Sequence, residues 1–345
     1  MPVTNKHWWF VVGAAFVAIV ALELGRHSLA PQAAALVVYC AHDQVFADEI
    51  LRDFERENGI RVNVRYDTEA TKSLGLVNLL IQEKNYPQCD VFWNNELLGT
   101  CELKEQDLLA PYCGPGFERI PERFKDPAGY WAGFAARLRV YIVNTDRCPV
   151  DEAWLEARLN GTDDLTRVAI AHPLFGTTLT QYTLLWHVWG EEKLKNWHRD
   201  LRQRGLREAS GNAATKNLVA DGACDFAFTD TDDFFGAKDA AKPVAMLPVR
   251  IDGNTICIPN SVAIIRGTRQ MAAAQKLVDY LLSAKTELRL ARSESRQVPL
   301  GPVPERDLPE AVRPLVAWGQ DGADLRPLLA DRQAVVRWLK AEFLR

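Results

Sequence analysis

Three aspartates that lie close together are the strongest chemical signal in this chain. Asp230, Asp232 and Asp233 directly follow the short apolar run 225–228. Carboxylate oxygens are hard donors that suit hard cations. Carboxylates that converge repel one another unless a cation neutralises them, and burying them unpaired is costly. If these side chains converge, we expect them to bind a metal ion or a ligand that carries a positive charge. The simpler alternative is that Asp232 and Asp233 cap the following helix and occupy its first turn.

Polar residues also follow each of three apolar runs in the N-terminal third of the chain. Ligands of open α/β sheets bind beyond the carboxyl ends of the strands. One such polar end is most simply a helix N-cap, but three at one sheet edge favour a shared binding site. The ligand-binding residues expected there are His42, Asp43, Glu69, Asn94, Asn95 and Glu96. His42 and Glu96 are the two that we expect to join the three aspartates as metal ligands.

A second motif favours an anion. Gly176-Thr177-Thr178 opens a predicted helix shortly after the apolar run Val168–Ala171. Backbone N–H groups and hydroxyls at such a position can hold a carboxylate, phosphate or carbonate. An ordinary N-cap at Thr177 or Thr178 is the alternative. Together with the aspartates, this motif fits a metal bound with an anion, or a zwitterion such as an aminophosphonate.

The elements that must position these residues alternate along the chain. Strands are predicted at 36–39, 60–66, 90–93, 138–143, 168–171, 225–228, 256–258 and 262–265. Helices are predicted near 46–58, 73–84 and 271–283, and another begins near Leu179; Asn58-Gly59 should end the first of them. Alternating strands and helices indicate an α/β fold with a parallel sheet. A length of 345 residues favours two domains or lobes.

The N-terminus has a different composition from the rest. Lys6 and His7 precede 15 apolar residues, Trp8–Leu22, which predict a secretory signal peptide or a short membrane anchor over about residues 8–24. Export makes disulfides possible. The seven cysteines are an odd number, so we expect at least one to stay free or to pair between chains.

Composition and motifs exclude several functions. The 41 Lys and Arg residues against 45 Asp and Glu give a net charge of −4, which is not the basic footprint of a nucleic-acid-binding protein. The sequence contains no G-x-S-x-G, H-E-x-x-H or P-loop motif. We therefore expect a binding protein with no catalytic residues and no catalytic cofactor. An enzyme on the same fold and a membrane-anchored sensor remain the alternatives.

The order of the segments resembles the type 2 periplasmic solute-binding proteins of ABC importers, specifically their ferric-iron-binding branch. The matching segments are 38–42, 54–62, 90–93, 176–178, 258–262, 277–282 and 297–300. The resemblance implies two α/β lobes with a hinge and an interlobe cleft, in a periplasmic and monomeric protein that delivers its ligand to a permease in the inner membrane. Lobe 1 would comprise 36–137 plus 256–300 and lobe 2 would comprise 138–255. Residues 1–35 would be the signal peptide or anchor and 301–345 a helical C-terminal tail.

The resemblance also implies a site, and here the sequence departs from the branch. In that branch two adjacent tyrosines on lobe 2 hold Fe³⁺, aided by a histidine and an acid from lobe 1. The matching position in this chain is Asp232-Asp233, and the sequence contains no Tyr-Tyr pair. The turn at 176–178 and Asn212 match the residues that hold a synergistic anion. The prediction is therefore iron or another hard metal as the transported ligand. An organic cation or zwitterion such as an aminophosphonate is the alternative.

Overall fold

The computed structural model describes residues 34–67, 74–174 and 176–343. The predicted signal peptide or anchor lies outside these residues, apart from its last positions, and so does Glu69. Among the described residues, no helix is both long enough and apolar enough to cross a membrane. All seven cysteines are described, none of them forms a disulfide, and five are buried.

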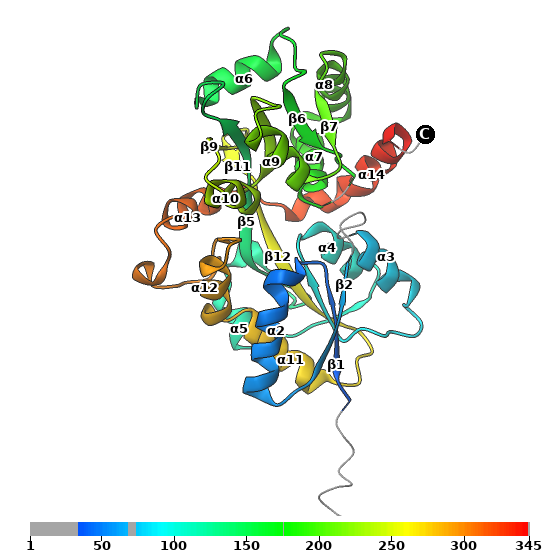
Figure 1. The fold of residues 1–345 in the computed structure, drawn as a ribbon. Coiled ribbons are helices and arrows are strands. Elements are labelled where there is room, and N and C mark those ends of the chain that lie inside the picture. Colours follow the sequence, from blue (N-terminus) through cyan, green and yellow to red (C-terminus); the bar gives the residue numbers. More distant parts are fainter. Residues whose placement is uncertain (1–33, 68–73, 175, 344–345) are drawn as a thin grey trace, which may run out of the picture. The chain divides into compact units, whose positions relative to one another are not determined.

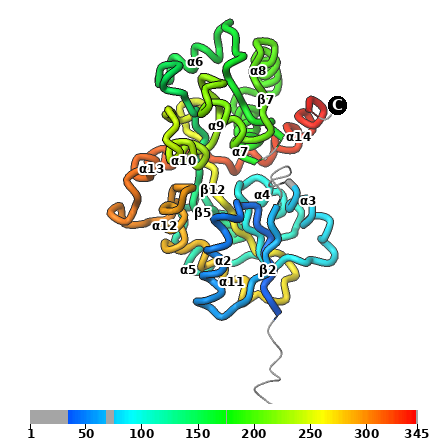
Figure 2. The backbone as a smooth tube through the Cα atoms, in the orientation of Figure 1, coloured from blue at the N-terminus to red at the C-terminus, as the bar shows by residue number. Residues whose placement is uncertain are grey.

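The core of the fold is a mixed sheet (Figures 1 and 2). The strands are β1 Leu36–Cys40, β2 Val62–Tyr66, β3 Val91–Asn94, β4 Leu109–Ala110, β5 Ala132–Asn144, β6 Val168–Ala171, β7 Arg207–Ala209, β8 Phe226–Asp230, β9 Val244–Pro248, β10 Arg250–Ile251, β11 Asn254–Thr255 and β12 Cys257–Ile265. The order in the mixed sheet is β2-β1-β3-β12-β5-β8-β6-β7, with β4 paired to β12 and β9 to β5, while β10 and β11 pair with each other in a separate two-stranded sheet. Strands β2-β1-β3 and β8-β6-β7 are two parallel sets. These are the strand–helix–strand units that the sequence predicts.

Two long strands join the parallel sets. The first residues of β5 pair with β12, and residues from Arg139 onwards pair with β8 and β9. β12 runs antiparallel to β3 and to β5. Every residue of β5 and β12 is buried, because both strands lie in the middle of the sheet.

The structure corrects two strand predictions. β5 begins at Ala132 and not at Leu138. The segments predicted as separate strands at 256–258 and 262–265 form the single strand β12. Pro259 lacks the N–H that a ladder needs, and the register of β12 against β5 shifts between Pro259 and Asn260. Such an irregularity lets a proline remain inside a strand, so the proline did not end it.

Helices cover both parallel sets. They are α2 Gln44–Asn58, α3 Leu74–Gln82, α4 Leu98–Glu105, α5 Pro115–Arg119, α6 Glu152–Asn160, α7 Gly176–Trp189, α8 Glu191–Gln203, α9 Asn212–Ala220, α10 Thr231–Asp239, α11 Met271–Leu281, α12 Ala284–Arg292, α13 Arg313–Gln320 and α14 Leu329–Phe343. Short 3₁₀ turns are η2 Glu122–Phe124, η3 Glu305–Asp307 and η4 Arg326–Leu328. As predicted, α2 ends at Asn58, and Gly59 takes the left-handed conformation (φ 65°) that terminates helices.

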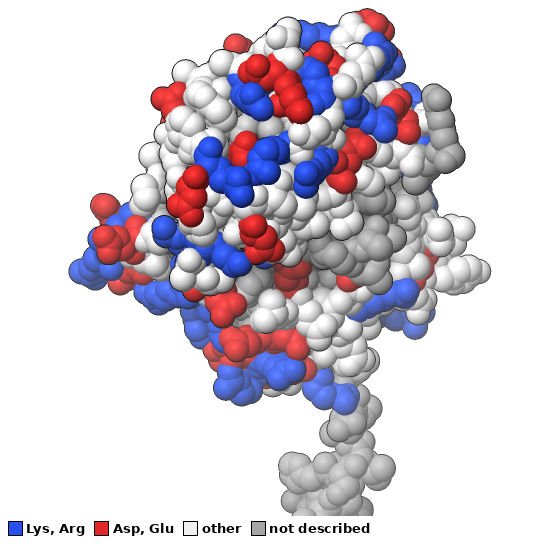
Figure 3. Space-filling view, turned by 45° about the horizontal axis from the view of Figure 1, so that its top comes forward, with Lys and Arg blue, Asp and Glu red and all other residues white. Residues whose placement is uncertain are grey.

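The C-terminal helix α14 packs on α7 and α4. Trp338 of α14 stacks on Tyr182 of α7, and the buried Arg332 forms an ion pair with Glu102 of α4. Because α4 precedes β5 in the chain and α7 follows it, α14 connects the two parts of the fold that β5 joins. Lys and Arg alternate with Asp and Glu on the face shown in Figure 3.

A buried histidine beside α14 makes stability depend on pH. His198 is 2% exposed, and its Nδ1 lies 3.0 Å from the Tyr182 hydroxyl. Burial lowers the pKa of His198 to about 4. The unfolded chain therefore binds a proton first as the pH falls, and stability is lost between about pH 6.5 and pH 4. We expect this contribution to appear as a difference of about 2 kcal/mol between wild type and His198→Phe in how the free energy of unfolding changes from pH 7 to pH 4.5, measured by urea denaturation.

His187→Gln is the matched control for that measurement. The His187 side chain is 44% exposed and lies on the same helix as Tyr182. The wild-type pH dependence should survive in this variant. A His198→Phe protein that retains the wild-type slope would contradict the assignment.

Candidate functional site

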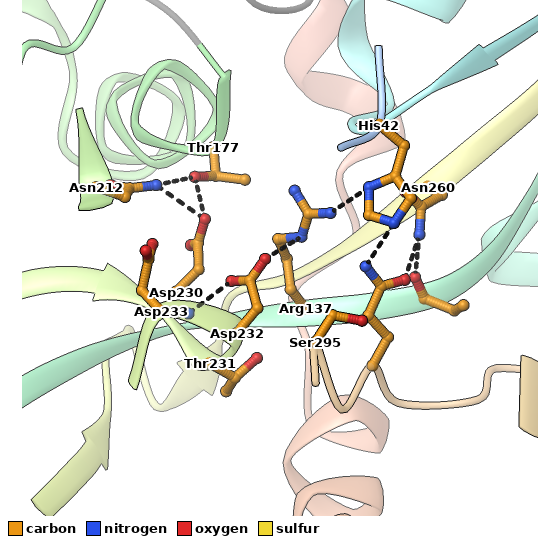
Figure 4. A network of polar contacts seen from close by, with 12 residues as sticks. His42, Arg137, Thr177, Asn212, Asp230, Thr231, Asp232, Asp233, Asn260 and Ser295 are labelled. Atoms are coloured by element: carbon orange, nitrogen blue, oxygen red, sulfur yellow. Dashed lines mark hydrogen bonds and ion pairs between the residues drawn. The ribbon is translucent and has the colours of Figure 1, made fainter. Parts of the chain in front are cut away.

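The three aspartates converge at the junction of β8 and α10. Phe226–Asp230 is a fully buried strand, Asp230 is the N-cap of α10, and Asp232 and Asp233 lie in its first turn. One carboxylate oxygen from each lies within 4.8 Å of the other two. Asp232 and Asp233 thus occupy the first turn of α10, as the simpler alternative predicts, but neither is the N-cap residue, and Asp230 makes no side-chain capping hydrogen bond. The same turn brings the three carboxylates together (Figure 4).

Asp230 is neutralised by a buried arginine. Arg139 of β5 is 0% exposed, and its Nη1 lies 2.9 Å from Asp230 Oδ1. The other carboxylate oxygen accepts from Thr177 Oγ1 at 2.6 Å and from Asn212 Nδ2 at 2.9 Å. Asn212 Oδ1 in turn accepts from Arg139 at 3.0 Å. Asp230 therefore has a complete set of partners within the protein and serves mainly to organise the site.

Asp232 faces a second arginine. The Nε atom of Arg137 lies 3.6 Å from Asp232 Oδ2. Arg137 is 3% exposed. It also belongs to β5 and precedes Arg139 by two residues, so successive same-face positions of one strand supply both cations.

Asp233 is the carboxyl group whose charge is least compensated. Its Oδ2 accepts from Thr229 Oγ1 at 3.0 Å. Burial, together with the neighbouring Asp232 and Asp230, raises the pKa of Asp233 to about 8. The group therefore carries a proton at neutral pH, and a cation that binds here would displace that proton.

A cavity of about 220 Å³ lies in front of these carboxylates. Residues from both sides of β5 line it. They are Asp43, Asn95, Arg137, Ala171, His172, Gly176, Thr177, Thr178, Ser210, Gly211, Asn212, Ala213, Asp230, Asp232 and Asp233. The first turns of α7, α9 and α10 reach the cavity, and their first N–H groups have no partner within the helix. The site therefore combines acidic side chains with the partial positive charge of helix N-termini.

Nine of the predicted site residues line this cavity, namely Asp43, Asn95, Gly176, Thr177, Thr178, Asn212, Asp230, Asp232 and Asp233.

Three predicted site residues, His42, Asn94 and Glu96, are not among those that line the cavity. The Glu96 carboxylate accepts from the backbone N–H groups of Leu98 and Gly99, at 2.6 and 2.7 Å, at the start of α4. Asn94 Nδ2 donates to Glu96 at 3.1 Å. His42 lies behind Arg137, with Nδ1 3.1 Å from the guanidinium. The structure does not place His42 or Glu96 with the three aspartates.

Sequence reasoning missed the two arginines. Charged residues are almost never fully buried unless they are paired. Arg137 and Arg139 lie within the apolar run 132–143. Two arginines in such a run indicate buried, paired charges, and this pattern could have identified them. His172, Ser210 and the backbone of 211–213 also line the cavity without having been predicted.

Comparison with solved structures shows which fold the chain has. Iron-bound HitA from Pseudomonas aeruginosa superimposes with a TM-score of 0.76 at 18% identity, covering 88% of this chain and 99% of HitA. AfuA from Actinobacillus pleuropneumoniae, with exogenous fructose-6-phosphate bound, has a TM-score of 0.65 at 18% identity and covers 90% and 98%. The chain thus has the two-lobed α/β architecture of type 2 periplasmic binding proteins, as its sequence predicted.

The chain belongs to the bacterial extracellular solute-binding protein family, whose model matches residues 49–303. Iron uptake protein A1 of Synechocystis is 23% identical over 321 residues, covering 87% of this chain and 88% of that protein. The family is one of extracellular solute-binding proteins and not of enzymes. The resemblance drawn from the sequence is therefore confirmed.

Proposed function

We propose that this protein is the solute-binding component of an ABC importer and that it captures a hard metal cation, iron in the first place. The observation that carries the proposal is the convergence of three carboxylates within 4.8 Å in front of a cavity. Oxygen donors suit hard cations. The names of HitA and of iron uptake protein A1 connect this fold with iron. Here aspartates take the place of a tyrosine pair, so the ion would be held by carboxylates.

Two lobes would close on the ligand. Lobe 1 comprises 36–137 plus 256–300 and lobe 2 comprises 138–255, so that β5 and β12 form the crossings. Asp43 and Asn95 then approach the ligand from one lobe and the aspartate cluster from the other. A bound ion would favour the closed form to the extent that it contacts both lobes.

The closed, monomeric protein would deliver its ligand to a permease in the inner membrane. Residues 1–35 direct export or anchor the chain, and 301–345 form the C-terminal tail.

An anion would complete the coordination of the metal. Gly176, Thr177 and Thr178 begin α7 at the cavity wall, opposite the start of α9 at Asn212. The side chains of Thr177 and Asn212 already bind Asp230. The anion would therefore be held chiefly by the N–H groups of the two helices.

Arg137 supports a second candidate ligand. A guanidinium and a carboxylate, those of Arg137 and Asp232, lie side by side at the cavity. This pair matches a zwitterion such as 2-aminoethylphosphonate, and AfuA shows that the fold accommodates an organic phosphate.

Calorimetric titration of the metal-stripped full-length chain distinguishes these ligands. We expect Fe³⁺-citrate, Fe²⁺ or another hard cation to bind, and a cation at 100 times its Kd to stabilise the fold by about 2.7 kcal/mol. Asp232→Asn should weaken that binding at least about tenfold, or 1.4 kcal/mol. Asp239→Asn is the control, since Asp239 is an exposed residue at the other end of α10. Binding of 2-aminoethylphosphonate alone, with no response to any metal, would overturn the metal assignment.

A further inference from the structure

Arg137 brings a fixed positive charge to the acidic cavity. Its side chain is only 4% exposed, it lines the cavity, and its Nε points at Asp232 from 3.6 Å (Figure 4). Arginine stays protonated in proteins at any accessible pH. The charge is therefore permanent, and it occupies one side of the space into which a metal ion would have to enter.

A histidine and a glutamine hold the guanidinium in place from behind. His42 Nδ1 lies 3.1 Å from Arg137 Nη2. Because arginine can only donate, His42 Nδ1 must accept, and the neutral imidazole carries its hydrogen on Nε2. Nε2 lies 3.2 Å from the amide of Gln297, which is 0% exposed. With the amide oxygen of Gln297 turned towards them, it accepts from both His42 and Arg137 at 3.2 Å. The sequence predicted His42 to be a ligand, but its contacts make it a support for Arg137.

The second arginine, Arg139, has other partners. Arg139 donates to Asp230, Asn212 and Gln181. It therefore compensates Asp230, and Arg137 is the cation paired with Asp232.

We propose that Arg137 is the internal counter-ion of the aspartate cluster: it neutralises Asp232 in the empty cleft, and a cation that binds must compete with it for that carboxylate. This inference rests on the proposed metal-binding function. A charge that opposes cation entry weakens every metal complex, and because Coulomb repulsion scales with the charge of the ion, it weakens multivalent complexes most. Arg137 therefore lowers the affinity that the three carboxylates alone would give a multivalent cation. The opposite role, an anchor for an anionic ligand, would place that anion next to Asp232 and Asp233.

A variant that lacks the positive charge of Arg137 distinguishes its role as a counter-ion from a role as an anchor for an anion. Tb³⁺, an oxygen-seeking trivalent probe, is titrated into wild type, Arg137→Met and Arg137→Lys. We expect Arg137→Met to bind Tb³⁺ at least about tenfold more tightly than wild type, because a competing cation is gone. Arg137→Lys keeps the charge and should stay near wild type. Unchanged or weaker Tb³⁺ binding by Arg137→Met overturns the proposal, and tighter binding of inorganic phosphate by wild type than by Arg137→Met would assign Arg137 to an anion instead.

Unfolding of the metal-free protein tests the pairing without any ligand. Arg137→Met should lower Tm by about 3 °C or more, and Asp232→Asn added to it should restore much of that loss. Arg296→Met is the control, since Arg296 pairs with the half-exposed Asp239 on the same helix. An equal Tm loss with and without Asp232 overturns the pairing. If the two substitutions are coupled but no variant binds a cation, the counter-ion stands and the proposed metal function fails.

Discussion

Arg139→Met is expected to lower the free energy of unfolding by about 3–5 kcal/mol, the usual cost of breaking a buried ion pair by removing one partner. The guanidinium is completely buried, and it donates to Asp230, Asn212 and Gln181. Methionine fills much of the same volume but supplies no donor. Asp230, itself 3% exposed, would keep its charge with only the Thr177 and Asn212 hydrogen bonds to compensate it.

Urea denaturation at pH 7 measures this loss, and two further variants isolate its cause. Arg139→Met combined with Asp230→Asn should recover a large part of the stability, because no unpaired charge is then buried. Arg167→Met removes a similar pair on the surface, where Arg167 Nε lies 2.7 Å from Asp225 Oδ1 and the arginine side chain is 37% exposed. That variant should lose no more than about 1 kcal/mol. A comparably small loss in Arg139→Met would mean that water or a shifted side chain compensates Asp230.

The aspartate cluster could be predicted because its positioning is local. A short apolar run ends at Phe228, and the chain turns directly into α10. The carboxylates come together within the single turn 230–233, so no distant element is needed to assemble them. The parallel strands β1, β2 and β3 were predictable for the same reason, since β1 and β3 are short apolar runs and β2 alternates apolar and polar residues.

The arginines could not be placed in this way. Taken alone, the segment Ala136–Val143 fits a strand whose polar residues face solvent. Its strand partners β8 and β12 lie about a hundred residues further along the chain, and α9, α10 and α12 pack against it, so that every residue of β5 is buried. Only that long-range pairing turns Arg137 and Arg139 towards the aspartates.

Polar residues at strand ends were predicted less well, for a geometric reason. Asn94, Asn95 and Glu96 are consecutive, and only Asn95 lines the cavity. Glu96 turns back to bind the N–H groups at the start of α4, and Asn94 binds Glu96. Sequence places such residues at the correct edge of the sheet. Whether one caps a helix or faces a ligand depends on side-chain directions that the sequence pattern does not contain.

Asp233→Asn is expected to weaken cation binding by at least about 100-fold, or 2.7 kcal/mol. Asp230 is compensated by Arg139 and Asp232 by Arg137. Asp233 pairs with neither arginine, so once a cation has displaced its proton, its negative charge is available to the ion. The asparagine keeps the shape and can still accept from Thr229, so the fold should be preserved. Calorimetry with the same cation measures the difference, and Asp239→Asn again serves as the control on α10.

The pH dependence of binding identifies Asp233 as the group responsible. Since burial and the neighbouring aspartates raise the pKa of Asp233 to about 8, a cation must displace a proton at pH 7. The affinity of wild type should therefore rise between pH 6 and pH 8 by up to about tenfold per unit and level off above. In the empty protein the same shift works in the other direction: stability falls as the pH rises from the unfolded pKa of 3.8 towards 8. The contribution of Asp233 to both slopes should be absent in Asp233→Asn. Because asparagine cannot ionise, a variant that binds more weakly but keeps the wild-type slope would show that the proton leaves another group, and Asp233 would then lose its place as the principal ligand.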